Sequence, residues 1–186
     1  MKHPSSRAFF AYWDQRRGDA AAPDRVAIEP GAIRSLLGDI FVVACDARSG
    51  YPFRVAGTRV GALLGRALKG ESLLAQFSAD SRIDGETLLD IAAGELRPIT
   101  AGLTATSETG ESVPLELLLL PFAPRPYTPA TMTGLLAPLK PMVRGPVSEL
   151  RPLSWRIIGR EQRRFGPRTM RKWQAARGLT VYDGMR

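Results

Sequence analysis

The chain has 186 residues, 44% of them hydrophobic and 24% charged. This is the composition of a globular domain large enough to bury its own core, so folding needs neither disulfides nor a structural metal. A single cysteine, Cys45, excludes an internal disulfide, and no apolar run approaches the roughly 20 residues needed to cross a bilayer. Residues 1–7 are polar and unlike a signal peptide, so we expect a cytoplasmic protein that makes no membrane contact.

The net charge of +8 is concentrated at one end of the chain. Residues 156–186 contain 9 Lys and Arg against 2 Asp and Glu, whereas residues 1–155 contain 17 against 16. The body of the protein is therefore nearly neutral. A partner attracted by positive charge would meet the C-terminal segment.

The N-terminal part of the chain predicts two helices. A helix is expected over residues 5–17, capped by a serine and ended by Gly18. Residues 19–29, rich in Ala, Pro and Asp, indicate a loop. A second helix is expected over residues 30–38, because proline is tolerated at a first helical position and an apolar stripe follows it.

From residue 39 onward the pattern becomes that of strands. Residues 39–46 and 52–56 are rich in β-branched and aromatic residues and flank a turn, which predicts a β-hairpin. The apolar spacing then predicts a short helix that Thr58 can cap and that ends at Gly65, and further helical turns, in two pieces, over residues 71–95.

Three further strands are predicted, over residues 97–106, 113–121 and 132–139. Beyond residue 141 the chain is Pro- and Arg-rich, with weak apolar content and a partly helical stretch around 159–176. We therefore divide the chain into an N-terminal helix and linker (1–29), a folded core (30–141) and a basic C-terminal extension (142–186).

The order of these elements favours an α+β fold, because the short helices are inserted between a leading hairpin and a trailing antiparallel meander. Residues 39–46 and 115–120 are apolar at successive positions, so both faces of their sheet must be covered. The inserted helices can cover one face. The N-terminal aromatic helix, or a partner subunit, can cover the other.

Six short segments are informative in their order and spacing: Tyr12-Trp13, FRVAGTR at 53–59, LGR at 64–66, LKG at 68–70, ELLLLP at 116–121 and Gly134-Leu135. With them, residues 7–155 resemble one bacterial subfamily of PAS domains. The resemblance implies a five-stranded antiparallel sheet with short helices on one face, often around a small-molecule cavity, and a role in signal transduction. It implies no particular cofactor, since members of this subfamily mostly lack an established ligand.

The chain departs from two ligand-binding types of PAS domain. Cys45 lies on the first predicted strand, whereas flavin-binding light sensors carry their cysteine motif in a helix. The sole histidine, His3, lies near a terminus, so a histidine-ligated haem is hard to build. We expect no attached kinase or cyclase domain, and we expect the chain to act alone or through a signalling protein partner.

We expect any ligand pocket to be lined by residues that face the inserted helices. These residues are Phe41, Phe53, Arg54, Leu63, Phe77, Leu103, Leu117 and Leu119. Arg54 and Arg59 flank Gly57 and could hold an anionic ligand, although solvation at the surface is the favoured interpretation. Glu116 is either a pocket-edge acceptor or partner of these arginines or, by a preference of about two to one, a solvent-facing carboxylate.

Catalytic chemistry has little support in the sequence. It requires a nucleophile beside a base, paired carboxylates or a metal cluster. Cys45 has no histidine partner in a folded element, so a buried small hydrophobic residue is the simpler interpretation. Asp46, Asp90 and Glu116 are scattered without metal-ligand spacing. We therefore expect neither enzymatic activity nor a metal site.

The aromatic residues of the first helix have two interpretations that the sequence does not separate. Phe9, Phe10 and Trp13 either pack on the sheet of their own subunit or form a dimer interface, where aromatic residues are enriched. Because PAS domains often pair through their N-terminal helix, the resemblance implies a homodimer.

The basic tail has three interpretations: a solvated extension, a segment that docks on an acidic protein, or a nucleic-acid grip. In the third, residues 156–186 would bind phosphates while aromatic residues such as Trp173 stack on bases. Two functional hypotheses result. The first is a non-catalytic sensory module that acts through protein–protein contacts, and the second is a nucleic-acid-associated regulator that binds through its tail.

Overall fold

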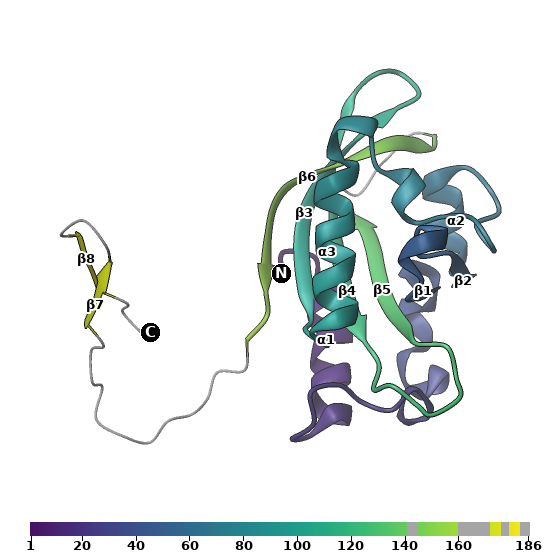
Figure 1. Ribbon diagram of the computed structural model, residues 1–186. Coiled ribbons are helices and arrows are strands. Elements are labelled where there is room, and N and C mark those ends of the chain that lie inside the picture. The colour runs from purple at the N-terminus through teal and green to yellow at the C-terminus, as the bar shows by residue number, and fades with distance from the viewer. Residues whose placement is uncertain (141–144, 160–171, 176–178, 183–186) are drawn as a thin grey trace.

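The centre of the protein is one six-stranded antiparallel sheet with strand order β2-β1-β5-β4-β3-β6, seen in a computed structural model (Figure 1). The structure describes residues 1–140, 145–159, 172–175 and 179–182. The strands of this sheet are β1 (Ile40–Ala44), β2 (Phe53–Ala56), β3 (Ile99–Ser107), β4 (Ser112–Pro121), β5 (Thr131–Pro138) and β6 (Val147–Ile157). The predicted antiparallel α+β fold with an N-terminal helix is confirmed, with one strand more than the five expected.

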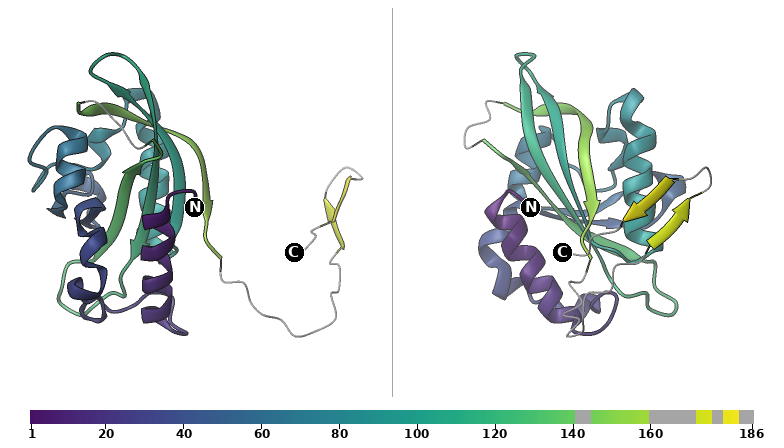
Figure 2. Two further views of the ribbon diagram at one scale, coloured as in Figure 1. Left: turned by 180° about the vertical axis from the view of Figure 1, so that it is seen from behind. Right: turned by 90° about the vertical axis from the view of Figure 1, so that its left-hand side faces the viewer.

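Helices cover both faces of the sheet, as the two views of Figure 2 show. The first face carries α2 (Thr58–Leu64), the short 3-10 helices η4 (Leu74–Gln76) and η5 (Ala79–Ser81), and α3 (Arg82–Gly94). The second face carries α1 (Pro4–Arg17) and the 3-10 helix η2 (Pro30–Asp39). Two short 3-10 turns, η1 (Arg25–Ala27) and η3 (Ala47–Ser49), lie in the connections.

The strands are apolar on both faces because their side chains alternate between two separate hydrophobic clusters. On β4, Leu115, Leu117 and Leu119 belong to the cluster of the first face. Leu118 and Leu120, between and beside them, belong to the cluster of the second face. The expectation that both faces need a cover is therefore confirmed, and α1 provides the second cover within the same chain.

The sixth strand lies in the segment that the sequence assigned to the C-terminal extension. β6 pairs with β3 along its length and buries Val147 and Leu150 in the first cluster. Its pattern escaped detection because the register shifts twice and Glu149 adopts a positive φ of 55°, so the alternation of apolar residues is interrupted. The folded body therefore extends well past residue 141.

Both helix caps expected from hydroxyl residues differ in the structure. The N-cap of α1 is His3, whose Nδ1 accepts a hydrogen bond from the Ser5 amide at 3.2 Å. At α2 the N-cap is Gly57, not Thr58, and no side chain caps the helix. Gly18 ends α1 as predicted.

Near the C-terminus, β7 (Lys172–Ala175) and β8 (Leu179–Tyr182) form an antiparallel hairpin. Residues 172–175 are therefore a strand where a helix was expected, and residues 160–171 lie outside the described part of the chain. Within the described residues, no helix is both long enough and apolar enough to span a membrane.

Candidate functional site

Seven of the eight predicted pocket residues lie together on the first face, packed against one another beneath α2 and α3. They are Phe41, Phe53, Leu63, Phe77, Leu103, Leu117 and Leu119, and each is at most 8% exposed. The rings of Phe41 and Phe53 meet edge to face, with their centroids 5.5 Å apart. The eighth residue, Arg54, is exposed on β2 and lies outside this cluster. These side chains belong to the hydrophobic core of the first face, and a ligand pocket among them remains a prediction.

Two hollows of the molecule lie elsewhere. The first, about 430 Å³, lies between η4, η5 and the start of β6, and Phe77 is the one predicted pocket residue in its lining. Its lining is half polar and half apolar, and there Arg66 donates to the Gln76 side-chain oxygen at 2.6 Å. The second, about 320 Å³, lies on the opposite face between η2 and β1, and Phe41 is the one predicted pocket residue that lines it.

The aromatic residues of α1 attach this helix to its own sheet. Phe9 and Trp13 are completely buried in the second cluster, which confirms the core interpretation for both residues. Their side chains are covered within this chain, and a dimer interface through α1 remains a prediction. Phe10 is only half-buried and stacks on Trp13 at 6.2 Å, so an interface through α1 would use Phe10.

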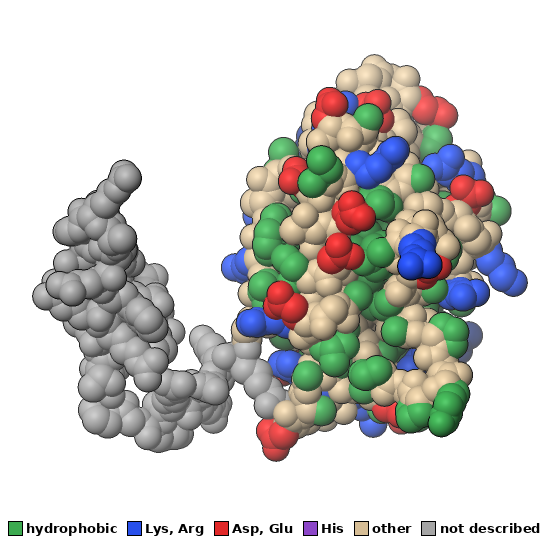
Figure 3. All heavy atoms as spheres, in the orientation of Figure 1, with side chains coloured by type: hydrophobic (Ala, Val, Ile, Leu, Met, Phe, Trp, Pro, Cys, Tyr) green, Lys and Arg blue, Asp and Glu red, His purple; other side chains and the backbone are tan. Residues whose placement is uncertain are grey.

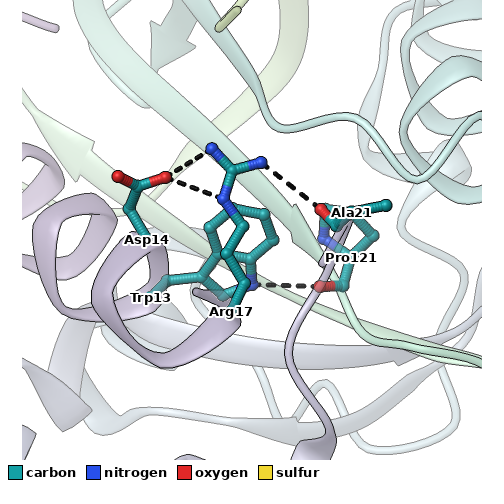
Figure 4. A network of polar contacts seen from close by, with 5 residues as sticks. All are labelled: Trp13, Asp14, Arg17, Ala21 and Pro121. Carbon is teal, nitrogen blue, oxygen red and sulfur yellow. Dashed lines mark hydrogen bonds and ion pairs between the residues drawn. The ribbon is translucent and has the colours of Figure 1, made fainter. Parts of the chain in front are cut away.

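A polar network fixes the end of α1 on the sheet (Figure 4). The indole Nε1–H of Trp13 donates to the carbonyl of Pro121, the last residue of β4, at 3.0 Å. The guanidinium of Arg17 lies over the Trp13 ring, 4.9 Å from its centroid, and donates to Asp14 and to the Ala21 carbonyl. Two of the segments that carry the family resemblance, Tyr12-Trp13 and ELLLLP, therefore meet at this hydrogen bond.

Glu116 fixes the other end of α1. Its carboxylate accepts hydrogen bonds from the backbone amides of Lys2 at 2.5 Å and His3 at 3.1 Å, and the residue is 4% exposed. The solvent-facing interpretation is wrong, because the chain start folds over this side chain. Glu116 does not pair with Arg54 or Arg59. Both of its carboxylate oxygens accept hydrogen bonds from the N-terminal backbone instead.

Arg59 is occupied by a different carboxylate. Its Nε and Nη2 donate to the two oxygens of the buried Asp39 at 2.6 and 2.8 Å, a bidentate pair that raises the pKa of the guanidinium further. Gly57 brings these segments together: a Cβ there would lie 2.1 Å from the Leu37 carbonyl oxygen, so only glycine permits this approach. Arg54 is exposed, in agreement with the favoured interpretation of solvation, whereas Arg59 forms an ion pair within the chain.

Most of the described chain matches a known protein family. Residues 1–137, which include α1, η2 and the first five strands, match the family described as PAS domain. The chain belongs to the PAS domain family.

Solved structures similar to this PAS domain include a variant of RsLOV (18% identity, TM-score 0.46, covering 58% of this chain and 65% of that one). They also include the LOV protein of Rhodobacter sphaeroides (18%, 0.42, 58% and 66%) and the PAS domain of an HTR-like protein from Haloarcula marismortui (18%, 0.43, 59% and 90%). The similarity thus spans just under two thirds of the two LOV chains. No match was found among curated proteins.

In this PAS domain the single cysteine follows β1 and is half-buried. Burial raises the pKa of the Cys45 thiol to about 11, so the side chain is a neutral thiol at physiological pH. Nearby, the buried Tyr51 donates its hydroxyl to Asp90, and desolvation together with this contact raises the pKa of the phenol. Among the described residues, no group of three or more His, Cys, Asp or Glu could hold a metal ion.

Sequence reasoning missed several residues that define the second face of this PAS domain. Arg17 looks like an ordinary basic residue in the last turn of a helix. The available signal was its position four residues after Trp13, because residues at this spacing lie side by side on a helix and the guanidinium can stack on the indole. The pairing of Asp39 with Arg59 and the return of Lys2 to Glu116 join distant positions and leave no local signal. The predicted nucleic-acid segment, 156–186, falls largely outside the described residues.

Proposed function

We propose that this PAS domain is a non-catalytic sensory module, that it signals through protein–protein contacts, and that α1 is the element that carries the signal. Membership of the PAS family over residues 1–137 supports the sensory role. The observation that supports the role of α1 is the division of the core into two clusters on opposite faces of one sheet.

The two clusters differ in how much they bury. Among the described residues, the first contains 25 buried residues, contributed by α2, α3, the strands and the segments between them, and the second contains nine, two of which come from α1. Because hydrophobic stabilisation grows with buried apolar area, α1 can change its packing at a lower cost than the first cluster can open. A two-state change in the packing of α1 is therefore the transition we assign to signalling.

The outward side of α1 is the surface through which we propose contact with a partner or a second copy of the chain. Arg7, Ala8 and Ala11 are exposed there, and the half-buried Phe10 adds an aromatic anchor. Arginine and aromatic residues are enriched in protein interfaces. A homodimer through this side would leave Phe9 and Trp13 in their intrachain positions.

The test compares two charge insertions at apolar positions on opposite faces. The tagged wild type, Phe10→Glu and Ile83→Glu proteins are purified from the host, and bound proteins are identified by mass spectrometry. Ile83 on α3 is a suitable control because it is 76% exposed. Acidic and basic side chains are scattered over the face of the molecule that Figure 3 shows. Light scattering of each purified protein measures whether the mass is 20.3 kDa or twice that value.

We expect Phe10→Glu to lose a partner, or to halve the mass of a dimer, while Ile83→Glu behaves as the wild type. Identical partners and masses for all three proteins, with unchanged circular dichroism, would contradict the assignment of α1 as the contact element.

A further inference from the structure

The hollow on the second face is lined by residues of α1, η1, η2, β1, β2 and β5 and of the connecting segments beside them. It has a volume of about 320 Å³, within the range typical of small-molecule sites, at its lower end. Its lining is Phe9, Arg25, Ile28, Pro30, Ile33, Leu37, Ile40, Phe41, Val42, Val55, Phe122 and Thr133. All but two of these side chains are apolar. A compatible ligand must therefore have an apolar body.

The two polar residues of the lining differ in what they offer a ligand. Thr133 donates its hydroxyl to the Phe41 carbonyl at 2.9 Å, so its donor is already used. Arg25 is the single charged residue of the lining and is exposed. Within the described part of the chain, no hydrogen bond or ion pair involves its guanidinium. The adjacent carboxylate, Asp24, is taken by Arg125, with an ion pair of 2.6 Å.

The rim of the hollow also exposes apolar surface. Leu37 and Val55 line it and are 37% and 55% exposed, and Val26, next to Arg25, is 70% exposed. When a ligand covers exposed apolar side chains beside a hollow, the burial of their surface stabilises the complex. A planar guanidinium without a partner favours a carboxylate, which it can bind through two parallel hydrogen bonds.

We propose that this hollow binds a small amphipathic monocarboxylic acid, with its apolar body between η2 and β1 and its carboxylate on Arg25. The site lies on the opposite face of the sheet from the predicted pocket residues of the first cluster, of which Phe41 alone also lines it. It extends the proposed function without depending on it, because binding can be measured on the purified chain alone. Since Phe9 of α1 and Ile40 of β1 both line the hollow, an occupant would contact the helix and the sheet together.

The experiment titrates the full chain with three probes that share one alkyl chain: octanoate, octanol and octylamine. Affinity is measured by calorimetry, and the site is mapped by amide chemical shifts. Arg25→Gln removes the charge, and Arg34→Gln is the matched control, because Arg34 is an exposed arginine of η2 that does not line the hollow. Val42→Phe fills the hollow from a half-buried position of β1, where an aromatic residue is compatible with the strand.

We expect saturable binding of octanoate, with shift changes at η2, β1 and β2. Arg25→Gln lowers the affinity for octanoate by about three- to tenfold, to the affinity for octanol. Arg34→Gln has no effect on octanoate binding, and Val42→Phe abolishes it. The proposal is overturned by the absence of binding, by equal affinity of octanoate and octanol in the wild type, or by shift changes confined to the first cluster. A further result would also overturn the proposal: the wild type does not bind octanoate, but Val42→Phe loses a protein partner. The hollow would then hold a side chain of that partner.

Discussion

The two faces of the sheet share the same strands but are covered in different ways. Within the part of the chain that the structure describes, the first face is closed by α2, α3 and several short helices over 25 buried residues. The second face is closed by α1 and η2 over nine buried residues, beside a hollow of about 320 Å³. Adjacent leucines of β4 serve opposite faces. This difference indicates a division of labour, in which the first face supplies most of the stability and the second face has room to change.

The largest effect is expected from removing β6, which completes the first face. Truncation after residue 140 deletes the partner of β3 and two buried residues, Val147 and Leu150. Burial of these side chains contributes about 3–6 kcal/mol, comparable with the whole stability of a small domain, so this chain should fail to unfold cooperatively. A chain ending at Gly159 keeps β6 and should melt cooperatively. Equal melting temperatures by circular dichroism for the two truncations would show that β6 does not belong to the core.

A second comparison uses two neighbouring leucines of β4. Leu117→Ala should destabilise by about 3–5 kcal/mol, because the closely packed first face cannot collapse around the cavity. Leu118→Ala on the second face should cost about 2–3 kcal/mol, since α1 can move toward the space left behind. Urea unfolding measures both. A larger loss for Leu118→Ala would reverse the assigned roles of the two faces.

The attachment of α1 is tested by removing one hydrogen bond. Trp13→Phe leaves the Pro121 carbonyl without its buried donor and should cost about 1–3 kcal/mol. Tyr12→Phe is the matched control, because the Tyr12 hydroxyl accepts only an exposed hydrogen bond, from the Glu29 amide, and its loss should cost under about 0.5 kcal/mol. The free energy of unfolding of both variants is measured with a chemical denaturant. If α1 is firmly attached, Trp13→Phe loses more stability than Tyr12→Phe. Equal losses would mean that α1 is loosely bound.

The smallest effect concerns the Cys45 thiol at the edge of the first cluster. Its pKa is about 11 in the folded protein and 9.0 ordinarily, so above pH 9 the unfolded chain loses the proton first. Stability therefore falls between pH 9 and about 11, by less than about 1.4 kcal/mol per pH unit, and is unaffected below pH 9. Urea unfolding at pH 8 and pH 10 should show a steeper loss for the wild type than for Cys45→Ala. The same loss in both proteins would place the thiol in water.

The sequence was sufficient for features that depend on local periodicity. Alternation in β3 and the aromatic spacing of α1 predicted these two elements, and successive apolar residues in β4 predicted two covered faces. It was insufficient for β6, where the positive φ of Glu149 interrupts the pattern. The role of Glu116 was also hidden, because its partners lie 113 and 114 residues away and their backbone amides carry no side-chain signature.

Hydrogen exchange of backbone amides, measured with increasing urea, tests the division between the two faces most directly. We predict that amides of α1 exchange through an opening with a lower free energy and a weaker urea dependence than amides of β4, which exchange only on global unfolding. Leu118→Ala should lower the opening energy of α1 further. If α1 and β4 exchange with the same free energy and the same urea dependence, the protein is one cooperative unit, and a signal carried by α1 alone is contradicted.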